Sequence, residues 1–148
     1  MRTPAAFIAL VFAAAVTLAS APALASANVD CQIDDKFITF DMEAIAGRSG
    51  PIVQVNVGRI AIKPAAAKLA APALTFDRSH IVQQWTLDDD LRLQIEVADD
   101  KTNEGVNLVL VARLDKKTEK YAGRYVLTIT RGGKTVDFKG RIKECQAG

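Results

Sequence analysis

The sequence is poor in the residues that most often carry catalysis or hold metal ions. Its 148 residues include one histidine and two cysteines. It has no G-x-S-x-G, H-E-x-x-H or Walker-type motif, the patterns that position nucleophiles, catalytic metals and phosphates. One histidine and two cysteines also cannot complete a four-ligand zinc site. We therefore predict a protein without enzymatic activity, cofactor or metal.

The single histidine, His80, has no partner pattern that would make it part of a catalytic triad. We interpret it as an exposed residue at the start of a strand. A hydrolase would instead need a cleft in which His80 meets a carboxylate.

Two acidic turns, Asp88–Asp90 and Asp99–Gly105, offer oxygen ligands of the kind that calcium takes. Neither turn matches the calcium-loop motif, and Lys101 falls among the carboxylates of the second. We interpret both as ordinary polar turns and predict no metal site.

Long apolar runs are also lacking, apart from a short one between Ala5 and Ala19. That run is short for a membrane span, but an early Arg2 and small residues further on are typical of a secretory signal. We predict a signal peptide over residues 1–27, with cleavage after Ala25 or Ala27. The remaining 28–148 is then a single exported domain, periplasmic or secreted, with no membrane span.

The two cysteines, Cys31 and Cys145, stand near the two ends of this domain. In an oxidising compartment such a pair is most simply a structural disulfide, because redox-active pairs more often form a close C-x-x-C. A bond that closes so long a loop is worth about 4 to 5 kcal/mol in the chain-entropy model. We predict that it ties the first and last strands together.

A β-hairpin is predicted from Lys120 to Cys145, around the turn Arg131-Gly132-Gly133-Lys134. Two adjacent glycines supply the positive φ angles that a two-residue type I′ turn requires. Folding the chain about this turn puts bulky residues opposite one another or opposite glycine, on one apolar face. The predicted pairs are Ile129 with Val136, Leu127 with Phe138, Tyr125 with Gly140 and Gly123 with Ile142.

Two-residue alternation of apolar and polar residues predicts further strands before the hairpin. Residues 37–46 and 52–63 form two of them, with a bulge or bend at Gly58 where the apolar phase changes. The segment 64–72, with a proline at each end, is predicted to be a loop. Residues 80–87, 91–97 and 106–114 continue as a meander into the hairpin.

The predicted fold class is all-β: a single antiparallel up-and-down meander of about seven strands, closed as a small barrel or a two-sheet sandwich. The registers that keep apolar faces together oppose Trp85 to Leu93, Leu93 to Leu110 and Leu110 to Tyr125. In outline this meander is similar to the calycin ligand-binding barrels, but no G-x-W motif lies near the first strand, as lipocalins usually have. We assign no family.

Charge is divided unevenly along the chain. Residues 28–112 hold 8 basic and 13 acidic residues, a net charge of −5, whereas residues 113–148 hold 10 basic and 4 acidic residues, a net charge of +6. In the predicted registers, basic side chains of neighbouring strands lie close together on the outer face. Like charges directly opposite each other cost stability, so water and salt, the acidic half of the chain or an anionic partner must offset that cost. These basic residues are Arg92, Arg124, Lys139 and Arg141.

Two functions are compatible with this reading. In the first, the exported domain binds an anionic partner at the cell envelope through the basic outer face; the partner is an anionic polymer, a lipid head group or an acidic protein, and no nucleic acid is expected. In the alternative, the domain carries a small apolar ligand inside a barrel. The residues predicted to line that interior are Trp85, Leu93, Leu110, Tyr125 and Phe138.

Overall fold

The computed structural model describes residues 27–47, 51–66, 68, 73–87, 89–99 and 104–147. The predicted signal peptide up to residue 26, Asp88 and residues 100–103 of the second acidic turn lie outside these ranges. The described chain forms nine strands and one 3₁₀ turn, η1 (Arg78–His80). The strands are β1 (Ala27–Asp34), β2 (Ile38–Ala46), β3 (Ile52–Ile62), β4 (Ala73–Thr75), β5 (Ile81–Leu87), β6 (Asp90–Asp99), β7 (Glu104–Asp115), β8 (Lys120–Arg131) and β9 (Lys134–Ala147).

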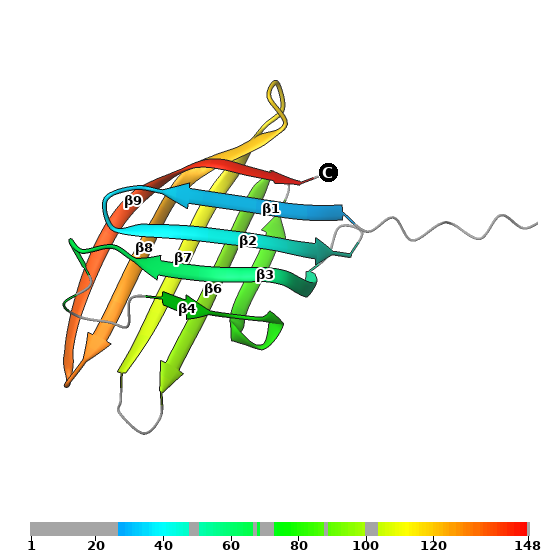
Figure 1. Ribbon diagram of the computed structural model, residues 1–148. Coiled ribbons are helices and arrows are strands. Elements are labelled where there is room, and N and C mark those ends of the chain that lie inside the picture. Colours follow the sequence, from blue (N-terminus) through cyan, green and yellow to red (C-terminus); the bar gives the residue numbers. More distant parts are fainter. Residues whose placement is uncertain are drawn as a thin grey trace, which may run out of the picture.

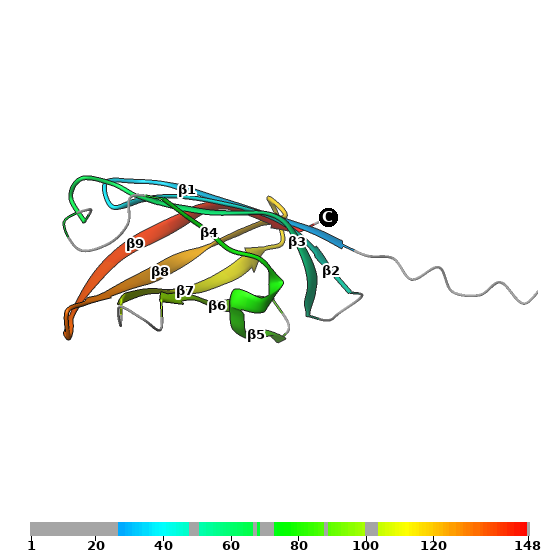
Figure 2. The same cartoon turned by 60° about the horizontal axis from the view of Figure 1, so that its bottom comes forward.

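The nine strands form one antiparallel sheet in the order β4-β3-β2-β1-β9-β8-β7-β6-β5. The sheet curls into a half-barrel, so that β1–β4 lie as one layer across the layer formed by β5–β8 (Figure 1). Strand β9 passes from the second layer towards the first, as Figure 2 shows from the side. The all-β antiparallel meander is therefore confirmed, and its closure is partial.

The predicted number of about seven strands was too low, because β1 and β4 were not recognised. Strand β4 has only three residues, too few to show alternation. Strand β1 does alternate, since Val29, Cys31 and Ile33 are buried and the residues between them are not, but its other positions are mostly polar.

A continuous apolar core fills the space between the two layers. Alternate residues of β1, β2, β6, β7 and β8 point into it, and most of these inward-facing side chains are almost wholly buried. Phe40 of β2 stacks on Phe76, with 5.7 Å between the ring centroids. The largest fully buried side chains are Tyr125, Phe40, Ile38, Met42, Ile60, Leu93, Ile95, Leu108, Leu110, Leu127, Ile129 and Cys31.

The β8–β9 hairpin has the predicted turn and the predicted register. Gly132 and Gly133 have φ angles of 56° and 74°, the left-handed region that a type I′ turn needs. All four predicted cross-strand pairs are present. Gly140 is a glycine for a further reason: a Cβ there would overlap the ring of Tyr125 and the carboxylate of Asp35. The ring covers the backbone that the glycine leaves bare.

The irregularity predicted at Gly58 lies slightly earlier in β3. Register shifts in the β2–β3 pairing fall opposite Glu43/Ala44 and Ile45/Ala46, so the bulges precede Gly58. Gly58 itself lies against the backbone of Phe76, whose N–H donates to the Gly58 carbonyl at 3.0 Å. A side chain at position 58 would overlap the Phe76 carbonyl.

The predicted register of β5 was wrong. Leu93 lies opposite Gln84, and Trp85 lies opposite Arg92. A register shift between Ile81 and Gln83 reverses the phase of the strand, since each one-residue slip moves a side chain to the other face. Trp85 therefore lies on the outer face, 43% exposed, and does not line the interior.

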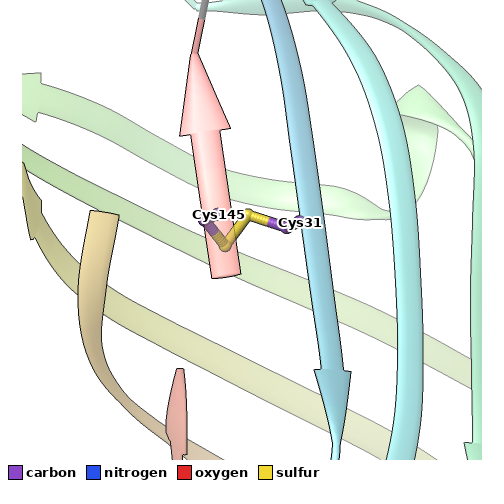
Figure 3. Close-up of a disulfide and its surroundings, with 2 residues drawn as sticks. All are labelled: Cys31 and Cys145. Carbon is purple, nitrogen blue, oxygen red and sulfur yellow. A yellow bond between two sulfur atoms is a disulfide. The ribbon is translucent and has the colours of Figure 1, made fainter. Parts of the chain in front are cut away.

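We call the junction of β1 with β9 the closed seam. Cys31 pairs directly with Cys145 in the ladder between these strands, and a disulfide joins them (Figure 3). The predicted bond is confirmed, and it ties the first strand to the last. The Cα atoms are 4.0 Å apart, as expected for a close cross-strand pair.

We call the junction of β3 with β5, at the other end of the curl, the open seam. No backbone ladder joins these two strands among the described residues. The side-chain amide of Gln84 instead accepts a hydrogen bond from the Ile52 N–H at 2.8 Å and donates one to the Ile52 carbonyl at 3.2 Å. One side chain thus occupies the place of a strand's peptide group.

Candidate functional site: the basic outer face

The basic residues singled out in the sequence do lie together on the outside of the sheet. Arg92 faces Val111, Val111 faces Arg124, and Arg124 faces Arg141 across four neighbouring strands. Lys139 is in the adjacent cross-strand row, opposite Val126. We call these four charged residues, Arg92, Arg124, Lys139 and Arg141, the basic face.

Three members of the basic face have no ion-pair partner in the described part of the chain. Among the described residues, no carboxylate forms an ion pair with Arg124, Lys139 or Arg141. Arg124 and Arg141 are also exposed and directly opposite each other. The repulsion between like charges in such a pair costs a few tenths of a kcal/mol to about 1 kcal/mol.

Arg92 is in a different environment. Its guanidinium contacts the carboxylate of Asp90 at 3.4 Å and lies 5.7 Å from the centroid of the Trp85 ring, a distance at which a cation–π interaction operates. Its Nε atom is buried and has no hydrogen-bond partner within the described ranges. Part of its charge is therefore already compensated by Asp90.

Apolar side chains lie between the cations. Val109 and Val126 oppose each other across β7 and β8, and Val111 lies in the arginine row. All three are partly exposed. Trp85 continues the arginine row onto β5. The arginine row and the row beside it thus combine cations with valines and one indole.

The outer face of the other layer has the opposite charge. Asp30, Asp41 and Glu43 line a hollow of about 470 Å³ together with amide side chains. No described lysine or arginine pairs with these three carboxylates. The uneven charge of the sequence therefore corresponds to two outer faces of opposite sign. The hollow is lined by Asn28, Asp30, Gln32, Asp41, Met42, Glu43, Ala44, Asn56 and Gln146.

The other residues predicted to line an interior are packed in the core. Leu93, Leu110 and Tyr125 expose 1%, 2% and 1% of their surface. A residue that lined a ligand-sized space would expose more of its surface to that space. Phe138 is partly buried and packs on Phe37, with the ring centroids 5.0 Å apart.

Tyr125 makes a polar contact at the edge of the core. Its hydroxyl donates to the carboxylate of Asp35 at 2.5 Å. Burial, together with this negatively charged partner, raises the pKa of Tyr125. Burial opposes ionisation of Asp35, but hydrogen bonds from Tyr125 and from the N–H groups of Phe37 and Ile38 outweigh it and lower the Asp35 pKa. The pair fixes the β1–β2 turn against β8.

His80 does lie against a carboxylate, that of Asp77, but the two residues form the cap of the 3₁₀ turn η1. The N–H of Ser79 donates to Asp77 at 2.8 Å, and the Ser79 hydroxyl donates to the same oxygen. Nδ1 of His80 lies 2.9 Å from that carboxylate and 3.1 Å from the Asp77 backbone nitrogen. In a triad the serine and the aspartate contact opposite ring nitrogens, whereas here both face Nδ1. The Asp-x-Ser-His pattern of residues 77–80 is the sequence signal of this cap, and it was not predicted.

The described part of the acidic turns contacts lysine and arginine. Asp89 pairs with Lys116 at 3.0 Å, and Asp90 lies near Arg92 and Arg113. Within the described ranges, no group of three or more His, Cys, Asp or Glu could hold a metal ion. No described helix is long and apolar enough to cross a membrane.

Comparison with known proteins finds no matching family model, no similar curated protein and no similar solved structure.

Proposed function

We propose that this chain is an exported, non-enzymatic β-domain that binds an anionic partner at the cell envelope through the basic face. The observation that carries the proposal is the direct opposition of Arg124 and Arg141 on the outer surface, with no carboxylate paired to either among the described residues. A bound anion would offset the repulsion between them.

The packing of the interior favours this proposal over a ligand carrier. Large apolar side chains from both layers bury one another almost completely, as in the filled core of a small barrel. The polar contacts of Tyr125 serve the fold, because they connect β8 to the β1–β2 turn. The remaining recognition surface is the outside of the sheet.

The proposal is tested by the double variant Arg124→Gln, Arg141→Gln. On a polyanion column such as dextran sulfate, the unmodified protein should be retained at low salt and released at high salt, because salt screens exposed charges. The double variant should elute at clearly lower salt. Its stability should be unchanged or higher by a few tenths of a kcal/mol, because the repulsion is relieved.

A matched control is Arg59→Gln, Lys68→Gln, which removes two exposed charges outside the basic face. Retention should change little in this control if the basic face is the contact surface. Equal loss in both double variants would show that net charge alone governs retention. Unchanged retention in the Arg124→Gln, Arg141→Gln variant would remove the proposal.

A further inference from the structure

We propose that the anionic partner is a phospholipid bilayer, and that the Trp85 indole enters its headgroup region while the basic face contacts lipid phosphates. This inference rests on the proposed function and specifies the partner. It depends on the observed register of β5, which places Trp85 on the outside in the same cross-strand row as Arg92, Arg124 and Arg141.

The mixture of cations and apolar side chains on this surface favours a bilayer over a linear polyanion as the partner. A sulfated or phosphorylated chain needs only cations in a row, and the valines between them add little to its binding. A membrane interface uses both components: cations contact anionic headgroups, while tryptophan and aliphatic side chains occupy the boundary with the acyl chains. The surface of β5–β9 offers both, since Val109, Val111 and Val126 lie among the cations and Trp85 lies at the end of the row.

The exposure of Trp85 is unusual within this molecule. Of the four large apolar side chains described as exposed, it is the only aromatic one. Its neighbour Arg92 lies near the ring and contacts the carboxylate of Asp90. Among the described residues, the charges of the basic face without an ion pair are therefore those of Arg124, Lys139 and Arg141. Neighbouring strands are about 4.8 Å apart, so the row from Trp85 to Arg141 extends over roughly 19 Å. Such a surface contacts several lipid headgroups at once.

The negative charge of the opposite outer face would determine which side of the protein turns towards the membrane. The two layers pack face to face, so their outer surfaces point away from each other (Figure 2). The hollow lined by Asp30, Asp41 and Glu43 belongs to the first layer. An anionic bilayer repels that face and attracts the basic face. The protein therefore approaches the membrane with Trp85 and the basic face in front.

The sequence contains one tryptophan, so its fluorescence reports directly on the proposed contact. The probe is a vesicle of phosphatidylglycerol mixed with phosphatidylcholine, with and without bromine on the acyl chains. At low salt we expect a blue shift of the Trp85 emission and quenching by the brominated lipid. High salt should reverse both changes, and vesicles of phosphatidylcholine alone should cause neither.

Variants separate the contributions of charge and indole in vesicle co-sedimentation. The change Arg124→Gln, Arg141→Gln should weaken binding about 25-fold, because each basic residue near an anionic surface contributes about fivefold. Trp85→Ala should weaken it roughly tenfold, and Trp85→Phe by less. A thermal unfolding curve for each variant shows that the fold is intact. The control Arg59→Gln, Lys68→Gln should bind much as the unmodified protein does.

Each outcome decides between specific alternatives. Retention on dextran sulfate without lipid quenching of Trp85 overturns the bilayer inference and leaves the proposed function standing, with a polyanion as partner. Binding to vesicles that Trp85→Ala does not weaken also overturns it, since the indole then has no part in the contact. Absence of binding to both probes removes the inference and the proposed function together.

Discussion

The two junctions at which the layers of the half-barrel meet are built in different ways. At the closed seam, β1 pairs with β9 along a backbone ladder, and the Cys31–Cys145 disulfide crosses it. At the open seam, the hydrogen bonds between described residues of β3 and β5 are those of the Gln84 amide with the backbone of Ile52. Beyond the shared core, the layers are thus joined by a covalent bond on one side and, in the described part of the chain, by two side-chain hydrogen bonds on the other. Local opening should begin at the open seam, where the fewest contacts must be lost.

The largest effect is expected from removing the disulfide. The variant Cys31→Ser, Cys145→Ser should lose roughly 4 to 5 kcal/mol of unfolding free energy, because the bond closes a loop with a sequence separation of 114. Urea denaturation measures the loss, and the unmodified protein under reducing conditions should match the variant. A loss below about 1 kcal/mol would mean that the ladder alone holds the closed seam.

The next largest effect is expected at Gly140, close to the same seam. In Gly140→Ala the new methyl group would overlap Tyr125 and Asp35, so the ring must move and the hydrogen bond between them breaks. We expect a loss of roughly 2 to 4 kcal/mol from overpacking and the lost charge-assisted bond. The control is Gly47→Ala, where nothing lies within 4 Å of the new atom. Equal urea midpoints for the two variants would contradict this account.

A smaller effect is expected at the open seam. Gln84→Leu keeps the size of the side chain but removes both hydrogen bonds to Ile52. The unfolding free energy should fall by about 1 to 2 kcal/mol, and hydrogen exchange of the Ile52 amide should accelerate. Gln83→Leu, at an exposed neighbouring position, serves as control. If Ile52 exchanges no faster in Gln84→Leu, the seam has another support.

The smallest effect is expected at the cap that leads into β5. Hydrogen bonds from Ser79 and His80 lower the pKa of Asp77 to about 2. Because this value lies below the ordinary 3.8, the stabilisation by the cap is complete above that ordinary value and is lost as the pH falls through about 2. The Ser79 amide resonance should titrate with that midpoint. In Asp77→Asn the transition should disappear.

The regular part of the fold could be predicted from the sequence. The glycine pair at 132–133 fixes the turn, and alternation on both sides fixes the register. Counting outward from that turn also places Arg124 opposite Arg141. The registers that bring apolar side chains together in the core also bring the basic side chains together on the outside. The basic face could therefore be predicted from the sequence alone.

The irregular part could not be predicted. The segment that begins β5 has apolar residues at 81, 82 and 85, a spacing that fits neither phase of a strand without a bulge. Trp85 was therefore assigned to the wrong face. The Gln84–Ile52 contact joins positions 32 residues apart through one side chain, and such a contact has no local sequence pattern.

The position of β9 between β1 and β8 has a consequence for how the chain is made. Each group of strands, β1–β4 and β5–β8, contains neighbours that pair in the order in which they are synthesised. In the backbone ladder, the two groups are joined through the 14-residue strand β9, which also brings the second cysteine. Until β9 has been synthesised, β1 and β8 each present a long unpaired edge that can join another chain. A product truncated before or within β9 would therefore be a substrate for quality control, although most of its sheet could have formed.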